Sequence, residues 1–251
     1  MTKRLRPFFS YFGSKYRIGA RYPAPQYGTI VEPFAGGAGY ATRYHDRHVR
    51  LVERDPLLAG LWRYLTTVSA AEILAIPDIG HDETTEDLDI CQEARWLVGF
   101  WVTRCASSPR KRPCAWMKDG TKPTSFWGPA VRERLAWQVE QIRHWRVTEG
   151  SYDLCPPYEA TWFVDPPYER LGKHYRFGTK SIDYGHLAAW CEARQGQVMV
   201  CENEGAQWLP FQPFHLAKGN ARNPTGVAKE ALYYTENKLG RGVDPRPLGC
   251  P

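Results

Sequence analysis

The sequence predicts an α/β fold that carries a largely helical insert. Short apolar segments bounded by turn residues are typical of buried strands, and five occur, at Thr29–Glu32, Val49–Glu53, Thr161–Asp165, Val198–Cys201 and Leu232–Thr235. Helical patterns separate several of them, and this alternation favours parallel strands joined by crossover helices. Between residues 68 and 147 the alternation stops, and no strand is expected there.

Caps and apolar stripes predict the helices. Pro56 lies at the first turn of the segment 56–67, where its missing N–H costs no helical hydrogen bond. The segment 183–194 places Leu187, Trp190 and Cys191 on one face. Within the insert, helices are expected over 93–104 and 129–145.

These elements divide the chain. Residues 1–67 and 148–240 are expected to form one unit, and 68–147 the insert, whose 107–128 loop is rich in Pro, Lys and Arg. Residues 241–251 are expected to be a flexible tail. With 251 residues and 43% hydrophobic side chains, the chain is long enough to bury an ample core.

Composition limits the class of protein. No apolar stretch approaches the roughly 20 residues needed to cross a bilayer, and the basic start of the chain has no apolar signal core behind it, so we expect a cytoplasmic protein without a membrane partner. Seven cysteines without a C-x-x-C pair favour reduced thiols and no metal. The net charge of +6 permits nucleic-acid binding without requiring it.

The charges are unevenly distributed. Five cations occur between residues 104 and 118 with no acid among them: Arg104, Arg110, Lys111, Arg112 and Lys118. Six acids lie between residues 78 and 89. The basic stretch is therefore the candidate for phosphate contacts, and Arg110, Lys111 and Arg112 are its strongest members. A solvated surface loop is the alternative. Among the tryptophans, Trp116 and Trp127 are candidates for wedging between bases.

The tetrapeptide Asp165-Pro166-Pro167-Tyr168 directly follows a predicted strand, which places its carboxylate at the sheet edge where open α/β folds bind ligands. The prolines lack N–H groups, so the Pro166 carbonyl is expected to be left as an outward acceptor. Two acceptors and a tyrosine ring suit a planar ring with an exocyclic NH2, and an anion there stabilises positive charge developing on the nitrogen. A plain turn is the alternative reading of these residues.

A second candidate site begins at the first strand. Thr29–Glu32 runs into a turn containing Gly36, Gly37 and Gly39, whose glycines let backbone approach a nucleotide-like ligand closely. The next strand ends at Glu53, an acid placed to bind ribose hydroxyls. Asp55 is an alternative ribose ligand or the N-cap of the following helix. Upstream, Lys15 is placed to neutralise a ligand carboxylate.

In this order, these segments resemble the Dam-like DNA N6-adenine methyltransferases over roughly residues 8 to 238. The resemblance implies a Rossmann-like seven-stranded mixed sheet of the class I methyltransferase type with helices on both faces, S-adenosylmethionine as cofactor, and the insert as target-recognition region. It also implies which residues hold the cofactor: Tyr11, Lys15, Glu32, Pro33, Phe34, Ala35, Gly36, Gly37, Glu53, Ser151, Tyr152 and Asp165. Asp165, Pro166, Pro167 and Tyr168 would form the catalytic segment around a flipped adenine.

Two segments depart from that family. Ser151-Tyr152 replaces its common Asp-Phe pair beside the cofactor adenine, so Tyr152 can still stack while Asp153 is a candidate for the missing carboxylate. The insert lacks the family's Arg-Tyr-Asn pattern, and no GATC target is inferred.

The expected partner is double-stranded DNA, bound by a monomer that flips one adenine out of the helix without using a metal. Methylation of cytosine N4, or of an amino group in RNA or protein, is the enzymatic alternative. Ser is usual at the first tetrapeptide position in the cytosine enzymes and Asn in those acting on protein glutamine, so Asp165 favours adenine. The other alternative is a catalytically inactive DNA-binding relative, which the intact segments 34–37 and 165–168 disfavour.

Overall fold

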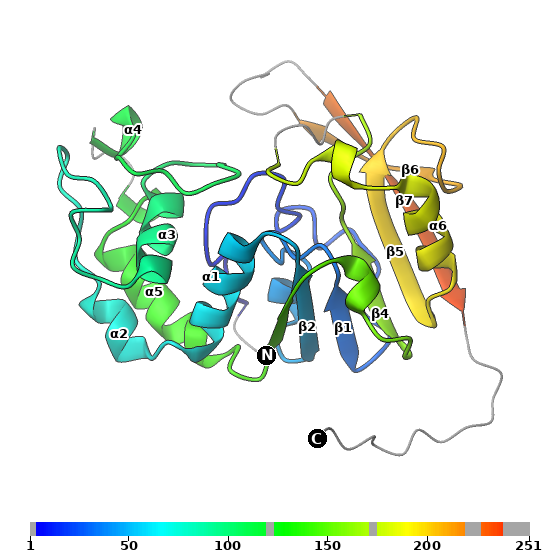
Figure 1. Ribbon diagram of the computed structural model, residues 1–251, viewed down its shortest axis with the longest axis horizontal. Helices are drawn as coiled ribbons and strands as arrows, with labels where there is room; N and C mark the ends of the chain where they lie inside the picture. The colour runs from blue at the N-terminus through cyan, green and yellow to red at the C-terminus, as the bar shows by residue number, and fades with distance from the viewer. Residues whose placement is uncertain (1–3, 119–122, 171–174, 219–226, 238–251) are drawn as a thin grey trace.

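A seven-stranded sheet runs through the part of the molecule that the computed structural model describes, namely residues 4–118, 123–170, 175–218 and 227–237 (Figure 1). Its strand order is β3-β2-β1-β4-β5-β7-β6. The strands are β1 (Thr29–Glu32), β2 (His48–Glu53), β3 (Arg146–Glu149), β4 (Ala160–Val164), β5 (Gly196–Asn203), β6 (Gln212–Lys218) and β7 (Val227–Asn237). The expected tail, 241–251, lies outside the described residues.

The sheet is mixed. Strands β3, β2, β1, β4 and β5 are mutually parallel, whereas β7 runs antiparallel to both β5 and β6. From β1 the chain leads first to β2 and β3 on one side and later to β4 and β5 on the other. The fold class predicted from the sequence, a Rossmann-like α/β sheet of seven strands, is confirmed. The switch between β1 and β4 is where such sheets bind ligands.

Helices cover both faces of the sheet. Neighbouring residues within a strand belong to two separate cores. Ile30 of β1 and Leu51 of β2 pack in the core that contains α1 (Pro56–Thr67), whereas the next residues, Val31 and Val52, pack in the core that contains α6 (Tyr184–Glu192). This division follows from the two-residue period of a strand. Asp55 accepts a hydrogen bond from the Leu57 N–H at 3.0 Å, so it is the N-cap of α1.

The insert contains four helices within the described residues: α2 (Ala70–Ala75), α3 (Gln92–Trp101), α4 (Ala115–Lys118) and α5 (Pro129–Glu140). In Figure 1 they lie together beyond α1, at one end of the molecule. Leu97 of α3 and Val131 of α5 belong to the same hydrophobic core as Ile30 of the sheet. The insert therefore has no separate core and is built onto the α1 face.

Several predicted bounds were wrong. Strand β3 begins at Arg146, inside the segment expected to contain no strand, and β6 was not predicted at all. β3 is an edge strand with only one apolar residue, and β6 contains Pro213 and an irregular register beside it, so neither shows an apolar run. In the insert, α3 ends at Trp101 and α5 at Glu140, three and five residues before the predicted ends, because the chain turns there.

Candidate functional site

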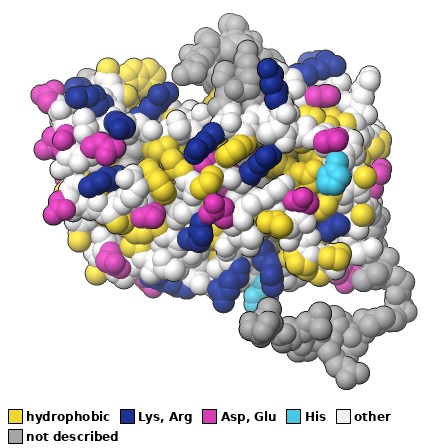
Figure 2. Space-filling model, in the orientation of Figure 1, with side chains coloured by type: hydrophobic (Ala, Val, Ile, Leu, Met, Phe, Trp, Pro, Cys, Tyr) yellow, Lys and Arg dark blue, Asp and Glu magenta, His cyan; other side chains and the backbone are white. Residues whose placement is uncertain are grey.

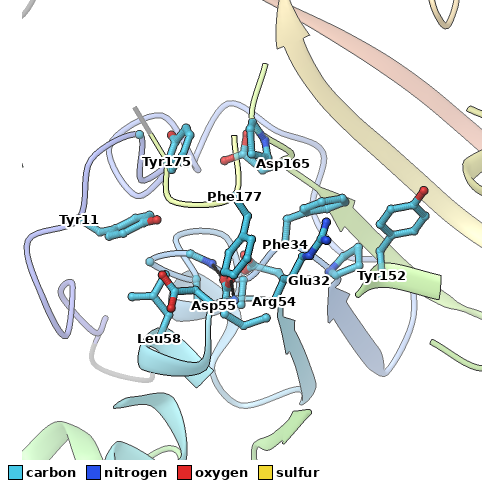
Figure 3. Close-up of a pocket in the computed structure, with 18 of the residues that line it drawn as sticks. Tyr11, Glu32, Phe34, Arg54, Asp55, Leu58, Tyr152, Asp165, Tyr175 and Phe177 are labelled. Atoms are coloured by element: carbon cyan, nitrogen blue, oxygen red, sulfur yellow. Dashed lines mark hydrogen bonds between the residues drawn. The ribbon is translucent and has the colours of Figure 1, made fainter. Parts of the chain in front are cut away.

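A cavity lies at the carboxyl ends of β1, β2 and β4 (Figure 3). Residues predicted from five separate parts of the sequence line it: Tyr11, Lys15, Glu32, Pro33, Phe34, Ala35, Gly36, Gly37, Glu53, Ser151, Tyr152, Asp165 and Pro167. Pro166 is buried and does not line the cavity, and neither does Tyr168. The structure thus brings the glycine-rich turn and the Asp165 segment to one space.

The glycine-rich turn wraps around the end of the cavity. Gly36 has a φ of +44°, a left-handed conformation that a side chain disfavours, and its N–H donates to Glu53 Oε2 at 2.8 Å. A Cβ at Gly39 would lie 2.5 Å from the Tyr16 nitrogen. The absent side chain at Gly39 therefore lets the segment carrying Lys15 pack directly against this turn.

Two carboxyl groups at this end of the cavity are hard to ionise. Burial raises the pKa of Glu53 to about 7, although the Asp55 and Gly36 N–H groups oppose the shift. Burial likewise raises the pKa of Glu32 to about 8, against a 2.5 Å hydrogen bond from the Ala41 N–H. Near neutral pH, Glu53 is therefore able both to accept and to donate hydrogen bonds, which suits a pair of vicinal hydroxyl groups.

Glu32 should make the stability of the protein depend on pH. The pKa of Glu32 is about 8 in the folded protein, above the ordinary value of 4.5. The stability that Glu32 contributes is therefore fully present below about pH 4.5 and is lost as the pH rises through 8. Between pH 6 and pH 9 the free energy of unfolding of the wild-type protein should fall. We expect this fall to be smaller by about 1–3 kcal/mol in Glu32→Gln. Urea unfolding at a series of pH values measures this. Glu133→Gln, at an exposed position on α5, is the control. Parallel curves for wild type and Glu32→Gln would contradict the assignment.

Asp165 is paired with a lysine. Lys15 Nζ lies 2.9 Å from Asp165 Oδ1, and the two side chains are 8% and 19% exposed. Burial raises the pKa of Asp165, whereas Lys15 holds it down. The sequence predicted that Lys15 would neutralise a ligand carboxylate, and in the structure Lys15 lines the cavity and pairs with Asp165.

The expected stacking role of Tyr168 is constrained by the same lysine. Lys15 Nζ lies 4.6 Å from the centroid of the Tyr168 ring, so one face of that ring is occupied. The Tyr168 hydroxyl donates to Glu230 Oε2 at 2.5 Å. In the same tetrapeptide, the Pro167 carbonyl accepts a hydrogen bond from Tyr184. One face of Tyr168 is therefore unavailable to an incoming ring, and the side chain does not line the cavity.

Aromatic rings form the other end of the cavity, where Figure 3 shows Phe34 and Tyr152 side by side. Their centroids are 5.3 Å apart and the rings are stacked. The Tyr152 hydroxyl lies 2.6 Å from His186 Nδ1, which fixes the ring. Asp153, the expected substitute for the missing carboxylate, is exposed and is not among the residues lining the cavity.

Sequence reasoning missed a segment that lies against the cavity, residues 175–182, which we call the strap. Tyr175 and Phe177 of the strap line the cavity, and in Figure 3 Phe177 lies in front of it. Arg176 pairs with Asp55 at 3.3 Å, and Arg54 donates to the Ser181 carbonyl at 2.9 Å. The strap has no apolar run; alternation of aromatic and cationic residues in 175–177 was its one signal in the sequence.

The predicted basic stretch does not stand free of the acidic one. Lys111 pairs with Glu86 at 3.3 Å, and Lys118 with Asp82 at 3.5 Å. Arg112 donates to the backbone carbonyl of Asp82. On the face shown in Figure 2, basic and acidic side chains are interspersed over the insert. The fold therefore brings the basic and acidic stretches, which are separate in the sequence, into contact with each other.

Arg104 and Arg110 differ from the other three cations. Both are exposed, and within the described ranges neither forms an ion pair. Next to Arg104, the Cys105 N–H donates to Ser10 Oγ at 2.9 Å, and the Ala106 carbonyl accepts from the Phe12 N–H at 3.1 Å. This end of the basic loop is thus joined to the segment that supplies Tyr11 and Lys15 to the cavity.

The two candidate wedge tryptophans have different environments. Trp127 is buried, and its indole N–H donates to the Pro77 carbonyl at 2.8 Å. Trp116 is 58% exposed. Burial excludes Trp127 from contact with bases, and Trp116 remains a candidate.

Three further features concern membranes, metals and thiols. In the described part of the chain, none of the helices combines the length and apolarity needed to span a bilayer. The same residues contain no group of three His, Cys, Asp or Glu side chains arranged to hold a metal ion. Their six cysteines are all free thiols.

Comparisons with known proteins found matches among solved structures. No protein-family model matches the chain, and no curated protein matches it. A "conserved hypothetical protein" from Streptococcus pyogenes is 13% identical, with a TM-score of 0.37 over 88% of this chain and 92% of that one. The rRNA methyltransferase AviRa from Streptomyces viridochromogenes is also 13% identical, with a TM-score of 0.40 over 91% of this chain and 87% of its own. Because both TM-scores are below 0.5, we draw no functional conclusion from either likeness.

Proposed function

We propose that this protein is an S-adenosylmethionine-dependent methyltransferase that modifies an exocyclic amino group of a nucleic-acid base, with adenine N6 in double-stranded DNA as the substrate. The observation that carries the proposal is the position of Asp165. Its carboxylate lines the same cavity as the Gly36 turn and Glu53, at the switch point of the sheet. A nucleotide-type pocket and an acceptor for an amino group are thus adjacent.

The residues of the cavity fit this cofactor. The backbone of the Gly36–Gly37 turn allows close approach of a chain of atoms, Glu53 suits the two ribose hydroxyls, and Phe34 with Tyr152 offers flat surfaces for an adenine. When bound, the cofactor supplies a methyl group already activated by its sulfonium. The protein then has to orient the acceptor and stabilise charge, with no covalent intermediate on the enzyme.

Asp165 carries the chemical part of the proposal. Adenine N6 is a weak nucleophile because its lone pair is delocalised into the ring. A carboxylate that accepts one amino hydrogen stabilises the positive charge that develops on the nitrogen. Lys15 favours the ionised form of Asp165 and holds it in place through the 2.9 Å contact. Removal of a base from the duplex costs a few kcal/mol, which stacking and phosphate contacts offset.

Phosphate contacts should come from Arg104 and Arg110, which form no ion pair with the described residues. Arg104 and Arg110 need not break an ion pair to reach a phosphate, whereas Lys111 and Lys118 must compete with Glu86 and Asp82. We expect Arg104→Gln with Arg110→Gln to lower the slope of log affinity against log salt by about 1.8, at about 0.9 per phosphate contact. The matched control, Lys111→Gln with Lys118→Gln, should change it less. Fluorescence anisotropy with a DNA duplex at several salt concentrations measures both, and equal slopes for the two double variants would contradict the assignment.

The activity itself is tested by incubating the purified protein with unmethylated genomic DNA and methyl-labelled S-adenosylmethionine, followed by digestion to nucleosides. The proposal requires label in N6-methyl-2′-deoxyadenosine of the DNA digest. Label in N4-methylcytosine, or labelling of RNA in place of DNA, would redirect the substrate assignment. Absence of transfer to DNA, RNA and protein, together with absence of cofactor binding by calorimetry, would overturn the proposal.

A further inference from the structure

The Asp165 segment contacts a second carboxylate that no sequence pattern identified as functional. Glu230 lies on β7, where it is paired with Asn203 of β5, and its side chain is 12% exposed. Its Oε2 accepts the hydroxyl hydrogen of Tyr168 at 2.5 Å and lies 3.9 Å from Lys15 Nζ. Glu230 does not line the cofactor cavity. It therefore contacts the Asp165 segment from outside the cavity lining, through Lys15 and Tyr168.

The charges of this cluster do not balance. Lys15 lies between two carboxylates, one on β7 and one, Asp165, at the end of β4. Because the ammonium neutralises one carboxylate, Asp165 with Lys15 alone would give a site with no net charge. Glu230 adds a second negative charge, so the cluster as a whole is anionic. An anionic cluster is what a reaction needs when positive charge develops on the acceptor nitrogen.

Glu230 also fixes the aromatic ring of the tetrapeptide. Burial raises the pKa of Tyr168 well above its usual value, so its hydroxyl keeps its hydrogen and needs an acceptor. Glu230 provides that acceptor, and Lys15 lies against the ring face. The ring is thus held from β7 and from the N-terminal segment together.

We infer that Glu230 is a positioning residue of the transfer site, which anchors Tyr168 and supplies a negative charge to offset the positive charge of Lys15 beside Asp165. This inference rests on the proposed function and extends it to β7. Other titratable groups around Asp165 are Glu32 on β1, Cys201 on β5, Tyr11 and Tyr22 in the N-terminal segment, and Tyr175 in the strap. Among the groups facing Asp165, Glu230 is distinguished by contact with both Lys15 and Tyr168.

The test is Glu230→Gln, which keeps an oxygen for the Tyr168 hydroxyl and removes the charge. We expect kcat to fall about 10- to 100-fold, with the affinity for S-adenosylhomocysteine unchanged within about twofold. Because Glu230 raises the pKa of Asp165, its removal should also shift the acid limb of the pH–rate profile to lower pH. Glu236→Gln, on the same strand and the same face of the sheet but exposed, is the control. It should change neither kcat nor the pH–rate profile. A wild-type kcat in Glu230→Gln would overturn the inference.

A second measurement separates this inference from the proposed function. Carbon-13 NMR titration of labelled aspartate carboxyls, assigned with Asp165→Asn, reports the pKa of Asp165 without any substrate. The inference requires a lower pKa of Asp165 in Glu230→Gln than in wild type, and no change in Glu236→Gln. If wild type transfers no methyl group, the proposed function fails, and the NMR result still decides whether Glu230 acts on Asp165. An unchanged pKa of Asp165 would overturn the inference even in an active enzyme.

Discussion

Asp165→Ala is expected to lose methyl transfer while cofactor binding is largely kept. The carboxylate stabilises charge on the acceptor nitrogen, whereas the predicted cofactor contacts come from the Gly36 turn, Glu53 and the Phe34–Tyr152 pair. Loss of one preorganised electrostatic group typically lowers kcat by about 100- to 1000-fold. Label transfer gives kcat, and calorimetry with S-adenosylhomocysteine gives the affinity.

Two further variants distinguish loss of catalysis from loss of folding. Asp165→Ala leaves the buried ammonium of Lys15 with Glu230, at 3.9 Å, as its nearest remaining carboxylate in the described structure. Asp165→Asn keeps the shape and an acceptor oxygen for Lys15, and we expect it to fold as wild type does and to be equally inactive. Asp153→Ala, at an exposed position outside the cavity, is the matched control and should be fully active. Near wild-type transfer by Asp165→Asn would contradict the role given to the carboxylate.

Lys15→Met is expected to destabilise the protein more at high pH than at low pH. The substitution leaves Asp165 and Glu230 close together without the cation between them. Breaking a buried ion pair by removing one partner costs about 3–5 kcal/mol. The pKa of Asp165, already raised by burial, should rise further because Lys15 no longer lowers it. The stability that this carboxyl contributes is full below its unfolded pKa and is lost as the pH rises through its folded pKa.

Urea unfolding at pH 5 and pH 8 measures this effect. Because the pKa of Asp165 is raised, its carboxyl is charged beside Glu230 to a greater extent at pH 8 than at pH 5, so the loss of stability should be larger at pH 8. Lys111→Met, which breaks the exposed pair with Glu86, is the control and should change the unfolding free energy by no more than about 0.5 kcal/mol at either pH. An equal loss for Lys15→Met at both pH values would show that the lysine matters for packing and not for charge.

The sequence predicts the central part of the fold well because local signals there agree with tertiary packing. β1 and α1 have the predicted bounds, since apolar runs flanked by a glycine turn and an Asp-Pro cap leave little choice. β4 ends at Val164, one residue before the predicted end, and Asp165 follows it directly. Residues 32–37, 53 and 151–152 reach one cavity because parallel strands place their carboxyl ends at the same edge of the sheet. Residues 11–15 reach it because their segment packs against the turn at Gly39.

Other features depend on contacts that no local pattern encodes. β3 and β6 are edge strands without an apolar run, and the strap is held by side-chain contacts to Arg54 and Asp55. Glu230 meets Tyr168 across 62 positions of sequence, so its role is visible only in three dimensions. The pairing of the basic loop with the acidic segment at Glu86 is of the same kind. Charge runs in a sequence do not reveal whether they face each other in the fold.

The most direct test of the central claim is a crystal structure of the protein with S-adenosylhomocysteine. The account predicts electron density in the cavity, with the ribose hydroxyls on Glu53, the adenine beside Phe34 and Tyr152, and the sulfur directed toward Asp165. Density at another site, or a ligand whose sulfur points away from Asp165, would contradict the claim that this carboxylate receives the acceptor amine opposite the methyl donor.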